Sequence, residues 1–167
     1  MSKRGYLTSA EYKALRQLLG FSQAEAAEFH GLQNLRTIQR WESGSSWVSD
    51  IACEKICALA AQIDATISGA LAEAGKCPAG ETEIVLVVYP DDCFRQYAAG
   101  IGDLPNSVHR AMIARTYDLL RQKGYAAGVV EFNPDDYAAY LRKNGLADGQ
   151  DVRAAWAAEY RERLLMN

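Results

Sequence analysis

Apolar residues in the first half of the chain recur every three or four positions, the spacing of helices that bury one face. Four helices are predicted, over residues 11–19, 23–29 and 35–42, and from Ser49 or Asp50 to about residue 73. Ser22 forms a capping box with Glu25 ahead of the second helix, and Asn34 is placed to cap the third. The loops between these helices are short, so the pattern predicts a compact all-α domain.

The pattern changes after residues 74–82, AGKCPAGET, a stretch with two glycines and a proline that is typical of a domain boundary. Residues 84–89 are a continuous run rich in β-branched residues, as in a strand buried on both faces, and residues 127–132 predict a second strand. Two helices are predicted between the strands, over about 90–99 and from about 105 to 124. Since a helical crossover connects them, the two strands are expected to be parallel.

Two further helices are predicted after the second strand. Asn133 and Pro134 are a strong start for the first, because Asn caps well and Pro suits the first helical position. The second begins near Asp148 and places one apolar stripe at helical spacing, formed by Val152, Trp156, Tyr160 and Leu164. The order β-α-α-β-α-α leaves only two strands, so either the helices shield them or a second subunit adds strands.

These elements predict an α+β, mostly α fold with two domains. Residues 1–75 form the helical domain, and residues 80–167 form a small α/β domain with a short parallel sheet. The composition agrees, because 49% hydrophobic and 23% charged residues are typical of a globular protein. No continuous apolar run approaches the length of a membrane helix, and the start lacks the apolar stretch of a secretory signal. We therefore expect a cytoplasmic protein without a membrane partner.

The net charge of −3 is unevenly distributed. Residues 1–48 carry six basic and four acidic side chains, whereas both later segments, 49–76 and 77–167, are net acidic. Any contact with nucleic-acid phosphates is therefore expected in the first segment.

No metal or cofactor is expected from the cysteines and histidines. Cys53 and Cys57 lie four residues apart on one helical face, and we interpret both as core residues. His30 is expected near the surface, and His109 has no carboxylate or cysteine at a ligand spacing. The acidic pairs 91–92 and 135–136 each follow a proline at a predicted helix start, where acids stabilise the terminus. No catalytic constellation is recognisable, so an enzyme is not predicted.

The most informative segment is residues 22–44, SQAEAAEFHGLQNLRTIQRWESG. It resembles the lambda-repressor-like (Xre-type) helix-turn-helix family, and within it the YdiL-like branch, which includes repressors encoded beside anti-CRISPR genes. The resemblance covers roughly residues 8–60. It rests on a set of residues in order, namely Gln23, Glu25, Ala26, Ala27, Gly31, Ile38, Trp41, Glu42 and Gly44.

The spacing within this segment has a physical logic. Ala26 and Ala27 allow close packing of two helices, Gly31 permits the turn, and Ile38 and Trp41 point inward. The third helix then turns four side chains outward as candidates for contacts with DNA bases in a major groove, namely Arg36, Thr37, Gln39 and Arg40.

Further roles follow from the resemblance and from helix ends. Gln23 and Asn34 are expected to contact DNA phosphates, Gln23 with help from a helix dipole. By resemblance, Arg16 and Glu42 are expected to form an internal ion pair that orients the third helix. One departure is that Ile38 lies seven positions after Gly31, where the spacing in the common family pattern is six.

The sequence therefore predicts a DNA-binding transcriptional repressor. One helix-turn-helix contacts few base pairs, so we expect a homodimer on an inverted repeat of double-stranded DNA, paired through the C-terminal domain. Three alternatives stay open for that domain: it senses a small-molecule effector, it masks a partner protein as an antitoxin does, or it is an enzyme fused to a DNA-binding module.

Overall fold

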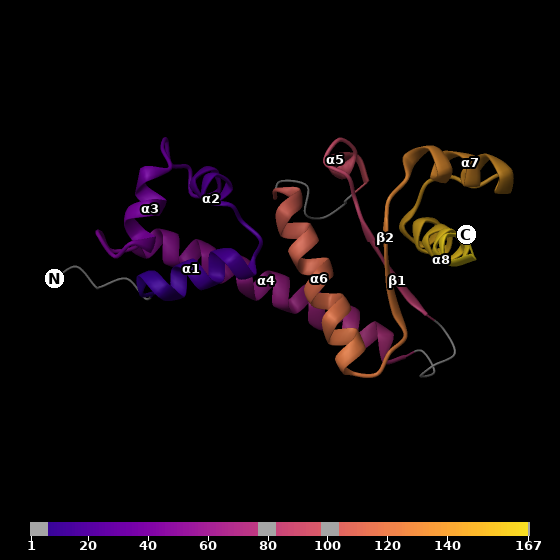
Figure 1. Ribbon diagram of the computed structural model, residues 1–167, viewed down its shortest axis with the longest axis horizontal. Helices are drawn as coiled ribbons and strands as arrows, with labels where there is room; N and C mark the ends of the chain where they lie inside the picture. The colour runs from indigo at the N-terminus through magenta and orange to yellow at the C-terminus, as the bar shows by residue number, and fades with distance from the viewer. Residues whose placement is uncertain (1–6, 77–82, 98–103, 167) are drawn as a thin grey trace. The chain divides into compact units, whose positions relative to one another are not determined.

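The computed structural model describes residues 7–76, 83–97 and 104–166 (Figure 1). The fold is α+β and mostly helical, with a small parallel sheet of two strands. The chain divides into two compact units, each made of two segments. Unit 1 comprises Met1–Ser68 and Asp103–Met112, and unit 2 comprises Gly69–Gly102 and Ile113–Asn167.

This division differs from the expected boundaries of 1–75 and 80–167. The helix α4, Asp50–Ala74, continues past the point where unit 1 gives way to unit 2. The start of α6, Asn106–Gln122, belongs to unit 1 although it lies far along the chain. The composition of residues 74–82 could not predict the extent of α4 or the place of the start of α6, because both depend on contacts between residues far apart in the sequence.

Unit 1 begins with three short helices, α1 (Ser9–Leu18), α2 (Gln23–Phe29) and α3 (Arg36–Glu42). Thr8 caps α1 in a full capping box with Glu11, and Ser22 caps α2 in the expected box with Glu25. The expected cap at Asn34 is wrong. The helix α3 starts one residue later than predicted, Leu35 occupies the cap position with helical backbone angles, and no side chain caps it. Its exposed N-terminus can bond water instead.

The core of unit 1 is formed by apolar side chains from α1 to α4. Tyr12, Ile38 and Ile56 are fully buried, and buried side chains on α4 repeat at helical spacing as Ala52, Ile56, Leu59, Ile63 and Ile67. The ring of Tyr12 contacts that of Trp41 edge to face, with centroids 5.4 Å apart. Cys53 is buried as expected, whereas Cys57 is exposed, so the interpretation of both cysteines as core was wrong for Cys57.

The first turns of α6 pack against this core at Gly20. Gly20 has a φ of +83°, and a Cβ there would lie 2.5 Å from the carbonyl oxygen of Ser107 and 2.7 Å from the Cβ of Ala111. Both the positive φ and the close approach require glycine. The Ser107 hydroxyl also donates a hydrogen bond of 2.7 Å to Glu25, the capping-box residue of α2.

Unit 2 is built on β1 (Ile84–Val88) and β2 (Ala127–Glu131), which pair in parallel from Ile84 opposite Ala127 to Val88 opposite Glu131. The helices α5 (Phe94–Tyr97) and α6 lie between the strands in the chain, and α7 (Pro134–Asn144) and α8 (Gln150–Met166) follow β2. The predicted order and the parallel pairing are confirmed. The predicted Asn133 cap is confirmed too, because its side chain accepts a hydrogen bond from the backbone N–H of Asp136.

An aromatic cluster forms the core of unit 2 between the sheet and the last two helices. Trp156 is fully buried and contacts the rings of Phe132, Tyr137 and Tyr160, with centroids 5.2, 5.6 and 4.9 Å away. Two expectations were wrong here. Leu164 does not join the buried stripe of α8, being 53% exposed, and β1 is half-buried along its length rather than buried on both faces.

Among the described residues, α4 alone is long and apolar enough to cross a membrane by length and composition. The sequence offered no continuous apolar run of that length, because polar residues interrupt the many alanines of α4. A core helix of a soluble protein meets the same criteria, and the buried side chains of α4 lie along one stripe in unit 1. The helix is therefore weak evidence for a membrane span.

Candidate nucleic-acid interface

The helix α3 has a buried face and an exposed face. Ile38 is fully buried and Trp41 is 5% exposed, so both point inward as predicted. On the other side Arg36, Gln39 and Arg40 are exposed, while Thr37 is half-buried. Three of the four side chains predicted to contact bases are thus exposed on the surface of α3, whereas the side chain of Thr37 is only partly accessible.

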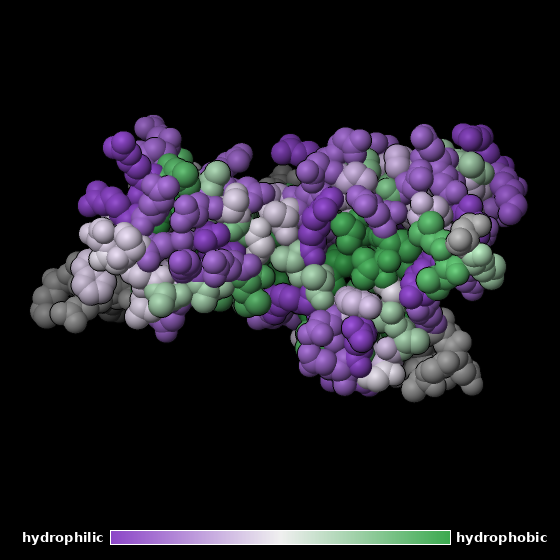
Figure 2. Space-filling view, viewed as in Figure 1, coloured by the Kyte–Doolittle hydropathy of each residue, from purple (hydrophilic) through white to green (hydrophobic). Residues whose placement is uncertain are grey.

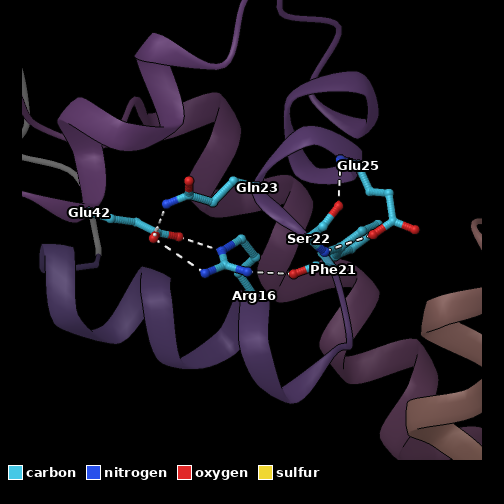
Figure 3. A network of polar contacts seen from close by, with 6 residues as sticks. All are labelled: Arg16, Phe21, Ser22, Gln23, Glu25 and Glu42. Carbon is cyan, nitrogen blue, oxygen red and sulfur yellow. Dashed lines mark hydrogen bonds and ion pairs between the residues drawn. The ribbon is translucent and has the colours of Figure 1, made fainter.

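A buried ion pair ties α3 to α1 (Figure 3). The guanidinium group of Arg16 binds Glu42 through two nitrogens, Nε to Oε1 and Nη2 to Oε2, the second at 3.3 Å. Both side chains are more than nine-tenths buried. The remaining guanidinium nitrogen donates to the backbone carbonyl of Phe21 just before α2. This is the pair that the resemblance implied, and it joins α1, α3 and the start of the helix-turn-helix.

Gln23 completes this network. Its side-chain Nε2 donates a hydrogen bond of 2.8 Å to Oε2 of Glu42 (Figure 3). Burial raises the pKa of the Glu42 carboxyl group, but the hydrogen bonds from Arg16 and Gln23 and the charge of Arg16 outweigh burial, so the pKa lies below its ordinary value. Glu42 is therefore held as a carboxylate with its partners in place.

The two predicted phosphate contacts have different surroundings. The half-buried side chain of Gln23 is bound to Glu42, which leaves one amide hydrogen for a phosphate. Asn34 is exposed in the turn before α3 and does not cap it. Sequence reasoning missed the role of Gln23 in the ion-pair network, because a helix-start glutamine gives no indication of a partner 19 residues away.

Trp47 is a second residue that sequence reasoning missed. It lies between α3 and α4 and is 74% exposed, next to the buried Val48. The signal in the sequence was a tryptophan among serines and glycine, in the segment SGSSW that follows α3. Large exposed aromatic side chains are enriched at binding surfaces, so Trp47 is a further candidate contact residue.

His30 is half-buried, in keeping with the partly exposed position that was expected, but its ring nitrogens face inward. Its ring contacts those of Tyr12 and Trp41, with centroids 5.8 and 5.7 Å away, and both of its nitrogens are buried with no hydrogen-bond partner in the described part of the chain. Burial lowers the pKa of His30 to about 4, and the positive charge of Lys55 contributes to the same shift. The imidazole is therefore neutral at the turn of the helix-turn-helix.

We expect this histidine to make unit 1 sensitive to acid. The pKa of His30 is lower in the folded chain than its ordinary value of 6.5, so the stability it contributes is present above pH 6.5 and is lost as the pH falls toward about 4. His30→Phe keeps a ring against Tyr12 and Trp41 and cannot be protonated. The wild-type melting temperature should fall between about pH 7 and pH 5, on the order of 5 °C more than that of His30→Phe.

His109 provides the control for this measurement. It is also buried in unit 1, and burial with the charge of Arg110 lowers its pKa to about 4. The variant His109→Phe should therefore remove a separate part of the acid sensitivity, and the double variant should remove both. An identical loss of melting temperature in wild type and His30→Phe would show that the pKa of His30 is the same in the folded and the unfolded chain, and would contradict the prediction.

Comparison with protein-family models finds no matching family, and comparison with curated proteins finds no match. Within the described residues no group of three or more His, Cys, Asp or Glu side chains lies in position to hold a metal ion.

Proposed function

We propose that this chain is a cytoplasmic, sequence-specific DNA-binding transcriptional regulator of the lambda-repressor-like type, and that it acts as a repressor. The observation that carries the proposal is the asymmetry of α3. One face is fixed to the protein by Ile38, Trp41 and the Glu42 network, and the other presents Arg36, Gln39 and Arg40 to solvent. A rigid helix with such a face fits the major groove of DNA.

The exposed side chains have the chemistry for reading base edges. Arginine donates two parallel hydrogen bonds to guanine, and glutamine both donates to and accepts from adenine. Because the backbone of α3 is fixed by buried contacts, these side chains are presented in a constant geometry, which sequence recognition requires. One such helix reads only a few base pairs, so we propose that two copies bind an inverted repeat as a homodimer.

The test is a selection of bound duplexes from a random pool, made with wild type and with Arg36→Ala plus Arg40→Ala. Wild type should enrich an inverted repeat. The double variant should bind that repeat about 100-fold more weakly, because each arginine-to-guanine contact contributes about 1–3 kcal/mol. Both substitutions affect exposed side chains, so the melting temperature should be unchanged.

A matched control removes two positive charges elsewhere. Arg142 and Lys143 are exposed on α7 in unit 2, so Arg142→Ala plus Lys143→Ala changes net charge equally without altering α3. This control should enrich the same repeat with wild-type strength. Failure of the wild type to enrich any sequence, or equal enrichment by the α3 double variant, would overturn the proposed function.

A further inference from the structure

Leu35 is an exposed apolar residue at the start of α3, the helix proposed to read DNA. Its side chain is 37% exposed, although Leu32 before it is half-buried and Ile38 after it is fully buried. The backbone of Leu35 has helical angles, and its carbonyl oxygen accepts a hydrogen bond of 3.2 Å from the N–H of Gln39. Leu35 and Gln39 therefore lie one turn apart along the same side of α3.

The exposed surface around Leu35 is otherwise polar. Within the described residues 33–40, every other exposed side chain forms hydrogen bonds readily, namely Gln33, Asn34, Arg36, Gln39 and Arg40. Figure 2 shows a small hydrophobic area among hydrophilic side chains near the turn between α2 and α3. A single exposed leucine is ordinary on a protein surface, but residues at the start of a recognition helix contact base edges. The chemistry of Leu35 therefore affects which bases α3 accepts.

We propose that Leu35 contacts the 5-methyl group of a thymine, and that it thereby requires a thymine at one position of each half-site. The inference rests on the proposed function and adds a specificity-determining residue to it. Every base pair presents hydrogen-bonding atoms in the major groove, and the methyl group of thymine is the apolar group there. A methyl group forms no conventional hydrogen bond, so its recognition falls to an apolar side chain rather than to Arg36 or Gln39.

The energetics of the groove favour this partner for Leu35. Against a polar base edge, the leucine side chain would exclude water from donors and acceptors without replacing their hydrogen bonds, which is unfavourable. Against a thymine methyl, two apolar surfaces leave water together, which is favourable. Because Ile38 and the Glu42 network fix α3 to the protein, Leu35 is presented to the groove in a constant position.

The test replaces each thymine of the selected repeat by deoxyuridine, one symmetric pair of positions at a time, which removes only the 5-methyl groups. Fluorescence anisotropy measures the dissociation constant of each duplex. Wild type should lose about fourfold in affinity for each contacted methyl, and so about 16-fold when both half-sites are changed at that position. Leu35→Ala should bind this deoxyuridine duplex and the thymine duplex with equal affinity, because the side chain that contacts the methyl is absent.

Two variants serve as controls. Leu35→Met keeps a flexible apolar side chain at the same place and should retain the dependence on the methyl group. Leu18→Ala removes a leucine of unit 1 that is 47% exposed on α1, outside α3, and should retain that dependence in full. Both alanine variants change exposed side chains, so their melting temperatures should lie within about 3 °C of wild type.

The outcomes separate this inference from the proposed function. A repeat that contains no thymine, or that binds equally well with deoxyuridine at every position, would refute the contact and leave the proposed function standing. An equal loss on methyl removal for wild type and Leu35→Ala would refute it as well, because another side chain would then contact the methyl group. If wild type enriches no repeat at all, the proposed function fails and the inference fails with it.

Discussion

Glu42→Ala should destabilise unit 1 by about 3–5 kcal/mol, because it leaves the buried guanidinium group of Arg16 without its counter-charge. The substitution also removes the acceptor of the Gln23 amide and the tie between α3 and α1. Urea unfolding followed by circular dichroism measures the loss. Binding to the selected duplex should fall with it, even at temperatures where the variant is folded, since α3 then loses its bonds to Arg16 and Gln23.

Two further variants distinguish this explanation from a general sensitivity to charge removal. Arg16→Met plus Glu42→Leu replaces both buried charges by apolar side chains and should recover most of the stability, because a buried ion pair and a well-packed apolar pair contribute similarly. Lys143→Ala breaks an exposed pair with Glu159 and should change stability by less than about 1 kcal/mol. A loss below about 1 kcal/mol for Glu42→Ala would mean that water reaches Arg16 in unit 1.

Trp156→Ala should destabilise unit 2 by about 3–5 kcal/mol, the usual cost of removing a fully buried aromatic side chain. The indole is in contact with three aromatic rings, and its N–H donates a hydrogen bond of 2.7 Å to Asp136. Trp156→Phe keeps a ring and removes only the hydrogen bond. It should therefore cost about 1 kcal/mol beyond the smaller packing loss, since Asp136 retains Arg163.

Trp47→Ala is the control for this prediction. It removes the same side chain from a site that is 74% exposed, so stability should change by no more than about 0.5 kcal/mol. Urea unfolding followed by far-ultraviolet circular dichroism is suitable, because it does not depend on the tryptophan signal. Equal losses for the two variants would contradict the description of Trp156 as the centre of the unit 2 core.

Local signals in the sequence predicted most of the secondary structure. The box of Ser22 with Glu25 and the cap at Asn133 were recognisable because each bond joins residues three positions apart. The same rule failed at Asn34. Asn34 has a side chain suited to capping, but Leu35 already has helical backbone angles and occupies the cap position of α3.

The exposed residues of the candidate site could be predicted from the sequence, but most of the buried contacts that support it could not. The exposed face of α3 follows from helical spacing, and the Arg16–Glu42 pair followed from a family resemblance. Spacing could not show that Gln23 bonds to Glu42 or that His30 lies beside Tyr12, because these contacts join separate helices. The exposure of Cys57 and Leu164 was mispredicted for a related reason. Periodicity shows which residues share one face of a helix, but it does not show how much of that face other elements cover.

The packing of Ser107 and Ala111 on Gly20 has a consequence for synthesis of the chain. All residues of α1 to α4 leave the ribosome before Asn106. The surface around Gly20, which the start of α6 covers in the folded chain, is therefore exposed to water at first. A nascent or truncated chain that ends after α4 lacks the hydroxyl that binds Glu25 and the backbone that covers Gly20. Unit 1 is completed only when residue 112 has been made, so a late segment of the polypeptide finishes the fold of an early one.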